Sequence, residues 1–153
     1  MKKEYETLLA EAKALIDRSL PLVSNLSNLS ACLNRMGGLN WCGFYLARKS
    51  DDGDALFLGP FQGEVACTKI PFGKGVCGKA AAEGRSIVVP DVLAFPGHIA
   101  CSSLSRSEIV VPILRGSRVL AVIDMDAPTF SRFDDEIREA LEAVAALIEP
   151  LFD

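Results

Sequence analysis

Hydrophobic residues recur at helical spacing at both ends of the chain. Near the start, apolar residues follow intervals of three and four between Leu8 and Ile16, and a second apolar segment runs over 22–33 after a proline. Near the end, residues 134–151 repeat apolar positions behind an acidic first turn, which a helix N-terminus favours. The pattern predicts two helices within residues 2–35 and one helix at the C-terminal end.

The middle of the chain, 40–128, carries short runs of aromatic and β-branched residues separated by turn residues, which predict strands. The turns at 50–54 and 115–118 each join two of these runs and predict two antiparallel hairpins. The expected strands are residues 41–47, 55–61, 86–89, 108–114 and 119–126.

Two segments between the hairpins have a different character. The small-residue run 76–83, which ends at Gly84, predicts a short helix. Residues 90–106 contain proline, glycine and several serines without either periodicity, so we expect a long ordered loop of the kind that often carries function. Helices at both ends around antiparallel hairpins indicate an α+β sandwich.

Composition narrows the class of protein. The 153 residues, 50% hydrophobic and 24% charged, are typical of one globular domain over 1–153. The net charge is −4 and no basic stripe is present, so nucleic acid is not expected as a partner. Acidic residues interrupt the first apolar segment, and no apolar run approaches the roughly 20 residues that span a bilayer. Neither a signal peptide nor membrane contact is therefore expected, and the expected location is cytoplasmic.

The five cysteines divide into two groups. Cys32 and Cys42 lie in apolar sequence and are expected to pack in the core. Cys67, Cys77 and Cys101 sit among turn residues, where a core-filling role is less expected. The cytoplasm keeps thiols reduced, and an odd count argues against a fully paired framework, so any disulfide is expected to be transient.

Cys77 follows the glycine-rich segment 72–76 at the start of the short predicted helix. Backbone N–H groups and the helix dipole would favour a thiolate there, whereas packing against the sheet is an equally open alternative. Zinc is not expected, because the chain has no C-x2-C pair and only one histidine, His98. His98 lies three residues before Cys101 and is expected to make a local hydrogen bond and not to serve a Cys-His protease.

Two acidic residues interrupt the last apolar strand. Asp124 and Asp126 point to the same face by strand alternation and predict a paired carboxylate site, unless the strand simply ends in solvent there. Glu108 opens the partner strand. A two-residue turn would place Glu108 opposite Met125 on the wrong face, whereas a three-residue loop or a bulge would bring it level with the aspartates. The sequence leaves both registers open.

Several motifs between residues 40 and 128 occur together in one known family. They include Asn40-Trp41, Leu58-Gly59-Pro60-Phe61-Gln62-Gly63, Ala66-Cys67, Ile70-Pro71-Phe72-Gly73-Lys74-Gly75-Val76-Cys77-Gly78, Phe95-Pro96-Gly97-His98-Ile99-Ala100-Cys101, and Asp124 with Asp126. With these motifs the chain closely resembles the free methionine-(R)-sulfoxide reductases, which are single GAF domains. The resemblance implies a central antiparallel sheet of about six strands. The N- and C-terminal helices would pack on one face, and the short helix and long loops would cover a ligand pocket on the other.

The resemblance also assigns roles to the thiols. Cys101 would attack the sulfoxide sulfur, Cys67 would be the resolving thiol, and Cys77 an accessory or alternative resolving thiol. Methionine leaves, Cys101 remains as a sulfenic acid, and a disulfide with Cys67 protects it from overoxidation. Reduction by thioredoxin would complete the cycle without a metal, flavin or nicotinamide. Members of this family are commonly homodimers.

A substrate site follows from the same resemblance. The departing oxygen needs a proton, which Glu108, Asp124 or Asp126 would supply. These carboxylates would also hold the ammonium group of a free amino acid. Trp41 and Tyr45, four residues apart on a predicted strand, would enclose the sulfoxide methyl group or else serve as ordinary core aromatics.

Two other functions remain open at this point. A non-catalytic GAF module could bind a small ligand such as a cyclic nucleotide or an amino acid, and a redox-sensing protein could cycle a disulfide without a substrate. A purely binding pocket has no need of thiols at Cys67 and Cys101, which favours the reductase.

Overall fold

The computed structural model describes residues 1–99 and 103–153 and has an antiparallel sheet at its centre. The strands within this described part of the chain are β1 (Trp41–Ser50), β2 (Gly53–Gly63), β3 (Lys69–Pro71), β4 (Ile87–Val89), β5 (Ser107–Arg115) and β6 (Arg118–Ala127). They lie in the order β3-β2-β1-β6-β5-β4, with antiparallel neighbours throughout. The helices are α1 (Lys3–Leu15), α2 (Leu22–Asn34), α3 (Gly75–Glu83) and α4 (Asp135–Ile148), with short 3-10 helices η1 (Val92–Ala94) and η2 (Glu149–Leu151).

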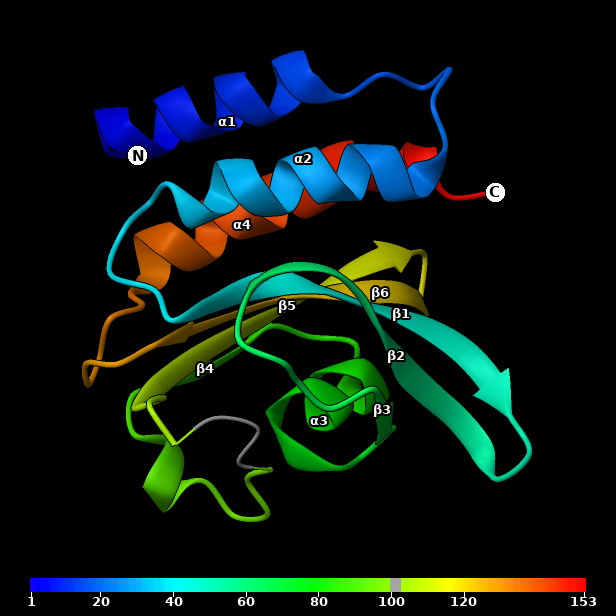
Figure 1. Cartoon of the computed structure of the whole chain (residues 1–153), viewed down its shortest axis with the longest axis vertical. Coiled ribbons are helices and arrows are strands. Elements are labelled where there is room, and N and C mark those ends of the chain that lie inside the picture. Colours follow the sequence, from blue (N-terminus) through cyan, green and yellow to red (C-terminus); the bar gives the residue numbers. More distant parts are fainter. Residues whose placement is uncertain (100–102) are drawn as a thin grey trace.

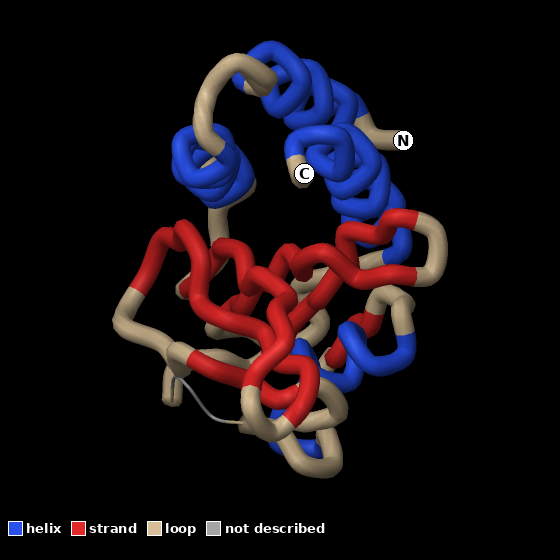
Figure 2. The backbone as a smooth tube through the Cα atoms, turned by 90° about the vertical axis from the view of Figure 1, so that its right-hand side faces the viewer, coloured by secondary structure: helices blue, strands red, loops and turns tan. Residues whose placement is uncertain are grey.

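The sheet separates two layers of helices. Helices α1, α2 and α4 lie over one face, whereas α3 lies against the other (Figure 1). The view turned by 90° shows the same layers, with both chain termini on the side of the three helices (Figure 2). The expected α+β architecture, with a six-stranded sheet and terminal helices on one face, is confirmed for the described residues.

Side chains on the two faces of the sheet belong to two hydrophobic cores. Successive residues of a strand point to opposite faces, so Ile109 of β5 packs toward the three helices and Val110 toward α3. The helix-side core includes Leu26, Leu29, Phe44, Ile109, Ile123 and Leu141. The pocket-side core includes Tyr45, Leu56, Ile70, Val76, Val110 and Val122. Cys32 and Cys42 are free thiols buried in the helix-side core, which confirms their expected packing role.

Two features of the first hairpin differ from the sequence pattern. Strands β1 and β2 extend further than expected, because the Ser50 hydroxyl hydrogen-bonds Asp52 and the Gly53 carbonyl and closes a tight turn. The pattern also misses β3, which pairs with β2 through Ile70. Three residues are too few to show alternation, and Pro71 is compatible with a strand only because β3 lies at the sheet edge.

A bulge in the β5–β6 hairpin determines the register that the sequence leaves open. The turn has two residues, since Arg115 pairs with Arg118. The pairing shifts by one residue just before Leu114, and beyond this shift Glu108 lies opposite Asp126. Opposite residues of an antiparallel pair share a face, so the bulge brings Glu108 to the pocket side of the sheet.

Helix α4 begins at a well-formed N-cap. The Asp134 carboxylate accepts a hydrogen bond of 2.9 Å from the Ile137 N–H, and the buried residues of the helix recur at helical spacing. The last turn becomes the 3-10 helix η2, where Pro150 has no N–H to continue α-helical bonding. The helix expected over 134–151 is thus present as the α-helix Asp135–Ile148 followed by the 3-10 helix Glu149–Leu151. None of the described helices has both the length and the apolarity needed to cross a membrane.

Removal of this N-cap should destabilise the protein measurably. We expect Asp134→Ala to lower the free energy of unfolding by about 1 kcal/mol, because the Ile137 N–H loses its acceptor. Asp135→Ala is the matched control, since that side chain is 91% exposed and caps nothing; its loss should stay within about 0.5 kcal/mol. Urea unfolding followed by circular dichroism measures both, and equal losses would contradict the capping role.

Candidate active site

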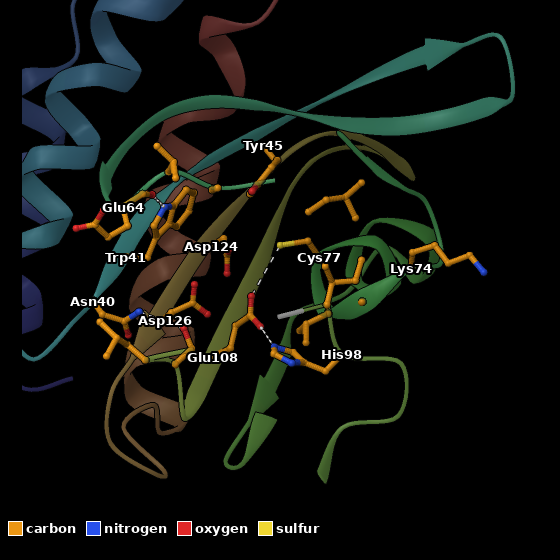
Figure 3. Close-up of a pocket in the computed structure, with 18 residues that line it drawn as sticks. Asn40, Trp41, Tyr45, Glu64, Lys74, Cys77, His98, Glu108, Asp124 and Asp126 are labelled. Atoms are coloured by element: carbon orange, nitrogen blue, oxygen red, sulfur yellow. Dashed lines mark hydrogen bonds and ion pairs between the residues drawn. The ribbon is translucent and has the colours of Figure 1, made fainter. Parts of the chain in front are cut away.

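A pocket opens on the side of the sheet that carries α3. Strands β1, β5 and β6 contribute to its floor, and its walls come from 64–66, the start of α3 and loop residues on both sides of 100–102. Acidic side chains of β5 and β6 point into this space from one side, and side chains of α3 and the loop face them from the other (Figure 3). The pocket therefore gathers candidate residues from distant parts of the sequence.

The structure brings the three predicted carboxylates together in this pocket. Glu108 is 6% exposed and Asp124 is 5% exposed, whereas Asp126 is partly exposed. Asp124 and Asp126 lie on the same face of β6, and Glu108 is directly opposite Asp126. The alternative that the aspartates mark a strand end in solvent is wrong, because β6 continues to Ala127 and Asp124 is buried.

Burial and mutual repulsion keep protons on this cluster. Burial raises the pKa of Glu108 well above its ordinary value, and the charges of Asp124 and Asp126 raise it further. Burial, followed by the charge of Asp124, likewise raises the pKa of Asp126 well above its usual range. The pKa of Asp124 is also raised by burial, although hydrogen bonds with Glu108 and Cys77 oppose the shift. The cluster therefore retains protons at pH values where exposed carboxyl groups have lost them.

Cys77 lies in the first turn of α3 and faces the carboxylates. The residue is 4% exposed, and its Sγ is 3.9 Å from Oε2 of Glu108. Burial raises the pKa of this thiol well above its ordinary value, and the charges of Asp124 and Glu108 add to the shift. Of the two alternatives for Cys77, packing against the sheet is confirmed, because Cys77 belongs to the pocket-side core. Lost hydration and the neighbouring carboxylates oppose a thiolate there more than the dipole of one helix end favours it.

The structure describes only one of the other two candidate thiols, Cys67. Cys101 belongs to 100–102 and lies outside the described residues. Cys67 is half-buried between β2 and β3, and its carbonyl accepts a hydrogen bond of 2.9 Å from the Tyr45 hydroxyl. Because the preceding residues 64–66 line the pocket, Cys67 adjoins it. The pairing of Cys67 with Cys101 stays a prediction.

Two stacked aromatic rings of β1 line the pocket. The ring centroids of Trp41 and Tyr45 are 5.7 Å apart, and Phe61 stacks on Trp41 at 5.1 Å. The Trp41 indole N–H donates a hydrogen bond of 3.1 Å to the Glu64 carbonyl, which fixes the ring. A Cβ at Gly43, between the two ring-bearing residues, would collide with Phe61, so only glycine allows β1 and β2 to approach here. Trp41 and Tyr45 are thus both core residues and pocket residues.

Two buried acceptor oxygens in the pocket have no hydrogen-bond partner among the described residues: Oδ1 of Asn40 and Oδ1 of Asp124. The amide nitrogen of Asn40 donates a hydrogen bond of 3.1 Å to the Ser105 hydroxyl. The amide oxygen of Asn40 takes no part in this bond. Buried acceptors without donors cost free energy, so this part of the pocket suits a ligand with N–H groups. No role of Asn40 is predicted from the sequence, because a single asparagine before a strand carries no chemical signal.

His98 also reaches the pocket, where sequence reasoning expected only a local hydrogen bond. Its Nε2 lies 3.9 Å from Oε1 of Glu108, and its side chain is 13% exposed. Burial lowers the pKa of the imidazole, which favours its neutral form. The one signal that could have pointed to the pocket is the position of His98 three residues before Cys101.

Among the described residues, Cys77, Glu108 and Asp124 could together hold a metal ion, since one ligand atom from each lies within 4.8 Å of the others. All three are buried, and the pKa of each is raised above its ordinary value. A metal would have to displace protons that the site holds firmly. The arrangement therefore favours proton transfer and the binding of a cationic N–H donor.

The chain is similar over most of its length to proteins of one known family. The GAF domain family matches residues 29–153. The free methionine-R-sulfoxide reductase of Saccharomyces cerevisiae is 45% identical over 94% of this chain and 82% of its own length, and the Escherichia coli protein of the same name is 41% identical over 95% and 86%. The X-ray structure of free methionine-R-sulfoxide reductase from Neisseria meningitidis in complex with its substrate has a TM-score of 0.89 at 44% identity, covering 97% of this chain and 87% of that one. The chain therefore belongs to the GAF-domain family and, within it, to the free methionine-R-sulfoxide reductases.

Proposed function

We propose that this protein reduces the free R epimer of methionine sulfoxide to methionine. The observation that carries the proposal is the buried cluster of Glu108, Asp124 and Asp126, which shares one pocket with Trp41 and Tyr45. The names of the yeast and Escherichia coli relatives support the same activity, as does the substrate complex of the Neisseria protein. A GAF domain that only binds a ligand has no need of protonated carboxyl groups beside thiols.

The first chemical step is assigned to Cys101 and Glu108. The Cys101 thiolate attacks the sulfoxide sulfur, and the sulfoxide oxygen passes to the cysteine sulfur together with a proton from Glu108. Methionine leaves, Cys101 becomes a sulfenic acid and Glu108 becomes a carboxylate, so atoms and charge balance. Burial and its two acidic neighbours favour Glu108 as the donor, because they keep its carboxyl protonated where an exposed acid is ionised.

Preference for a free amino acid is assigned to the acceptor oxygens of Asn40 and Asp124. A substrate ammonium would supply N–H donors to both unpartnered atoms. A methionine sulfoxide residue within a peptide has an amide in place of this ammonium and would leave a buried acceptor unsatisfied. The stacked rings of Trp41 and Tyr45 would enclose the sulfoxide methyl group.

A disulfide completes the proposed cycle. The Cys67 thiol bonds to the sulfur of the Cys101 sulfenic acid, and the sulfenic oxygen leaves as water with the thiol hydrogen. Thioredoxin then reduces the disulfide and is itself oxidised. Cys77 is an accessory thiol in this scheme, since its raised pKa makes it a poor thiolate. The protein would act in the cytoplasm, as its composition favours, and as a homodimer, as the resemblance implies.

Turnover of the separate epimers tests the proposed reaction. With dithiothreitol as reductant, we expect methionine from the R epimer only, and none from the Cys101→Ser variant. Without reductant, Cys67→Ser should release one methionine per chain and accumulate a sulfenic acid, because no resolving thiol follows; dimedone labelling and mass spectrometry detect it. Cys42→Ala, which removes a thiol from the helix-side core, is the control and should retain turnover. Wild-type turnover by Cys101→Ser would refute the thiol mechanism.

The role of Glu108 should appear in the pH profile. A group with a raised pKa donates a proton below that pKa, so its contribution to kcat is present at low pH and is lost as pH rises through it. Glu108→Gln should lower kcat by about 10²-fold or more and remove this alkaline decline. Glu139→Gln is the matched control, since its side chain is exposed on α4, which lies over the other face of the sheet. An unchanged profile in Glu108→Gln would assign the proton to another group.

Recognition of the ammonium should depend on Asp124. We expect Asp124→Asn to raise KM for the free amino acid roughly 10- to 100-fold, because a hydrogen bond to a charged group contributes about 1.5–3 kcal/mol. N-acetylmethionine sulfoxide has no ammonium and serves as the control substrate, with a high KM that the substitution leaves nearly unchanged. Equal effects on the two substrates would contradict ammonium binding at Asp124.

A further inference from the structure

The proposed cycle leaves Glu108 without a proton after every turnover, and the proton must return to a buried group. Four titratable side chains surround Glu108. Cys77 and His98 lie 3.9 Å from its two carboxylate oxygens, and Asp124 and Asp126 share hydrogen bonds with it. These neighbours differ in what becomes of their charge when they give up a proton.

We propose that His98 is the residue that returns a proton to Glu108 after each turnover. The inference rests on the proposed function, because it takes Glu108 as the donor to the sulfoxide oxygen. His98, neutral between turnovers, takes up a proton from water when the adjacent Glu108 is a carboxylate and passes it from Nε2 to Oε1 of Glu108, which leaves a neutral imidazole and a neutral carboxyl group. Ionisation of the Cys101 thiol after the disulfide is reduced releases one proton, and Glu108 takes up one, so the cycle needs no further proton.

Charge favours His98 over the other neighbours of Glu108. Donation by Asp126, Asp124 or Cys77 would only move the negative charge to another group in the same buried cluster. Donation by His98 removes a positive and a negative charge together, which burial favours. The lowered pKa of His98 and the raised pKa of Glu108 both drive the proton in this direction. Lys74 and Glu64 are the remaining charged residues that line the pocket.

The loop holds His98 in place for this role. The His98 N–H donates a hydrogen bond of 3.2 Å to the Phe95 carbonyl across a turn in which Gly97 has a φ of +75°. Phe95 and Ile99, on either side of His98, both pack against the pocket-side core. A Cβ at Gly75 would approach within 3.0 Å of Ile99, so the loop lies close to the start of α3. The imidazole is thus directed at Glu108 from a segment anchored at both ends (Figure 3).

A comparison of the first turnover with the steady state isolates this step. In the resting protein Glu108 already carries its proton, so His98→Gln should form the first methionine at the wild-type rate in a quenched-flow experiment. With saturating dithiothreitol, kcat should fall roughly tenfold, below the ~10²-fold effect of losing the donor itself, and should decline further with rising pH. A purely structural role of His98 would slow the first turnover as well.

Two further variants connect the effect to Glu108. His98→Ala should regain kcat when imidazole is added, whereas His98→Ala combined with Glu108→Gln should not respond. His98→Gln should have no additional effect on kcat in the Glu108→Gln background, since no proton then has to return. Additive losses, or no response of His98→Ala to imidazole, would overturn the inference.

The same assays separate failure of this inference from failure of the proposed function. If the wild-type protein forms no methionine from either epimer, the proposed function is wrong. If the wild-type protein turns over and His98→Gln matches its kcat at every pH, only the role of His98 is wrong.

Discussion

A one-residue shift in the β5–β6 register brings the three carboxyl groups together in the pocket. Arg115 pairs with Arg118, so an uninterrupted ladder would place Glu108 opposite Met125 and direct its carboxyl group into the helix-side core. The bulge shifts the pairing by one residue, so Glu108 instead lies opposite Asp126 and faces the pocket side. Burial of a carboxyl group without partners costs several kcal/mol, whereas here the aspartates and Cys77 share hydrogen bonds with it.

Once gathered on one face, the carboxyl groups determine the electrostatics of the pocket. Their burial holds protons on them, and the same field raises the pKa of Cys77 although this thiol lies at a helix N-terminus. Partial charges at a helix end contribute about 0.3–1 kcal/mol, which is less than the loss of hydration at a fully buried group. A thiolate is therefore more favourable outside this cluster than within it.

Much of the fold could be predicted from sequence, because its elements have strong local signals. The C-terminal helix has both a capping aspartate and a continuous apolar stripe, and the central strands alternate cleanly. Strand β3 lacks such a signal, since pairing with β2 defines its three residues. The face of Glu108 depends on a bulge, and the protonation of Cys77 depends on burial. Neither follows from local sequence, because both arise from contacts between segments far apart in the chain.

The two faces of the central strands explain how a polar site fits within a stable fold. Along β6, Ile123 and Met125 continue the helix-side core without interruption, while Asp124 and Asp126 alternate with them on the other face. Packing against the helices therefore stays intact where the pocket side turns polar. His98 and Asn40 complete the site from loops, whose positions depend on neighbouring anchors such as Ile99. Chemistry at this pocket can thus change through loop and pocket-side residues, because the helix-side core supports the strands independently of them.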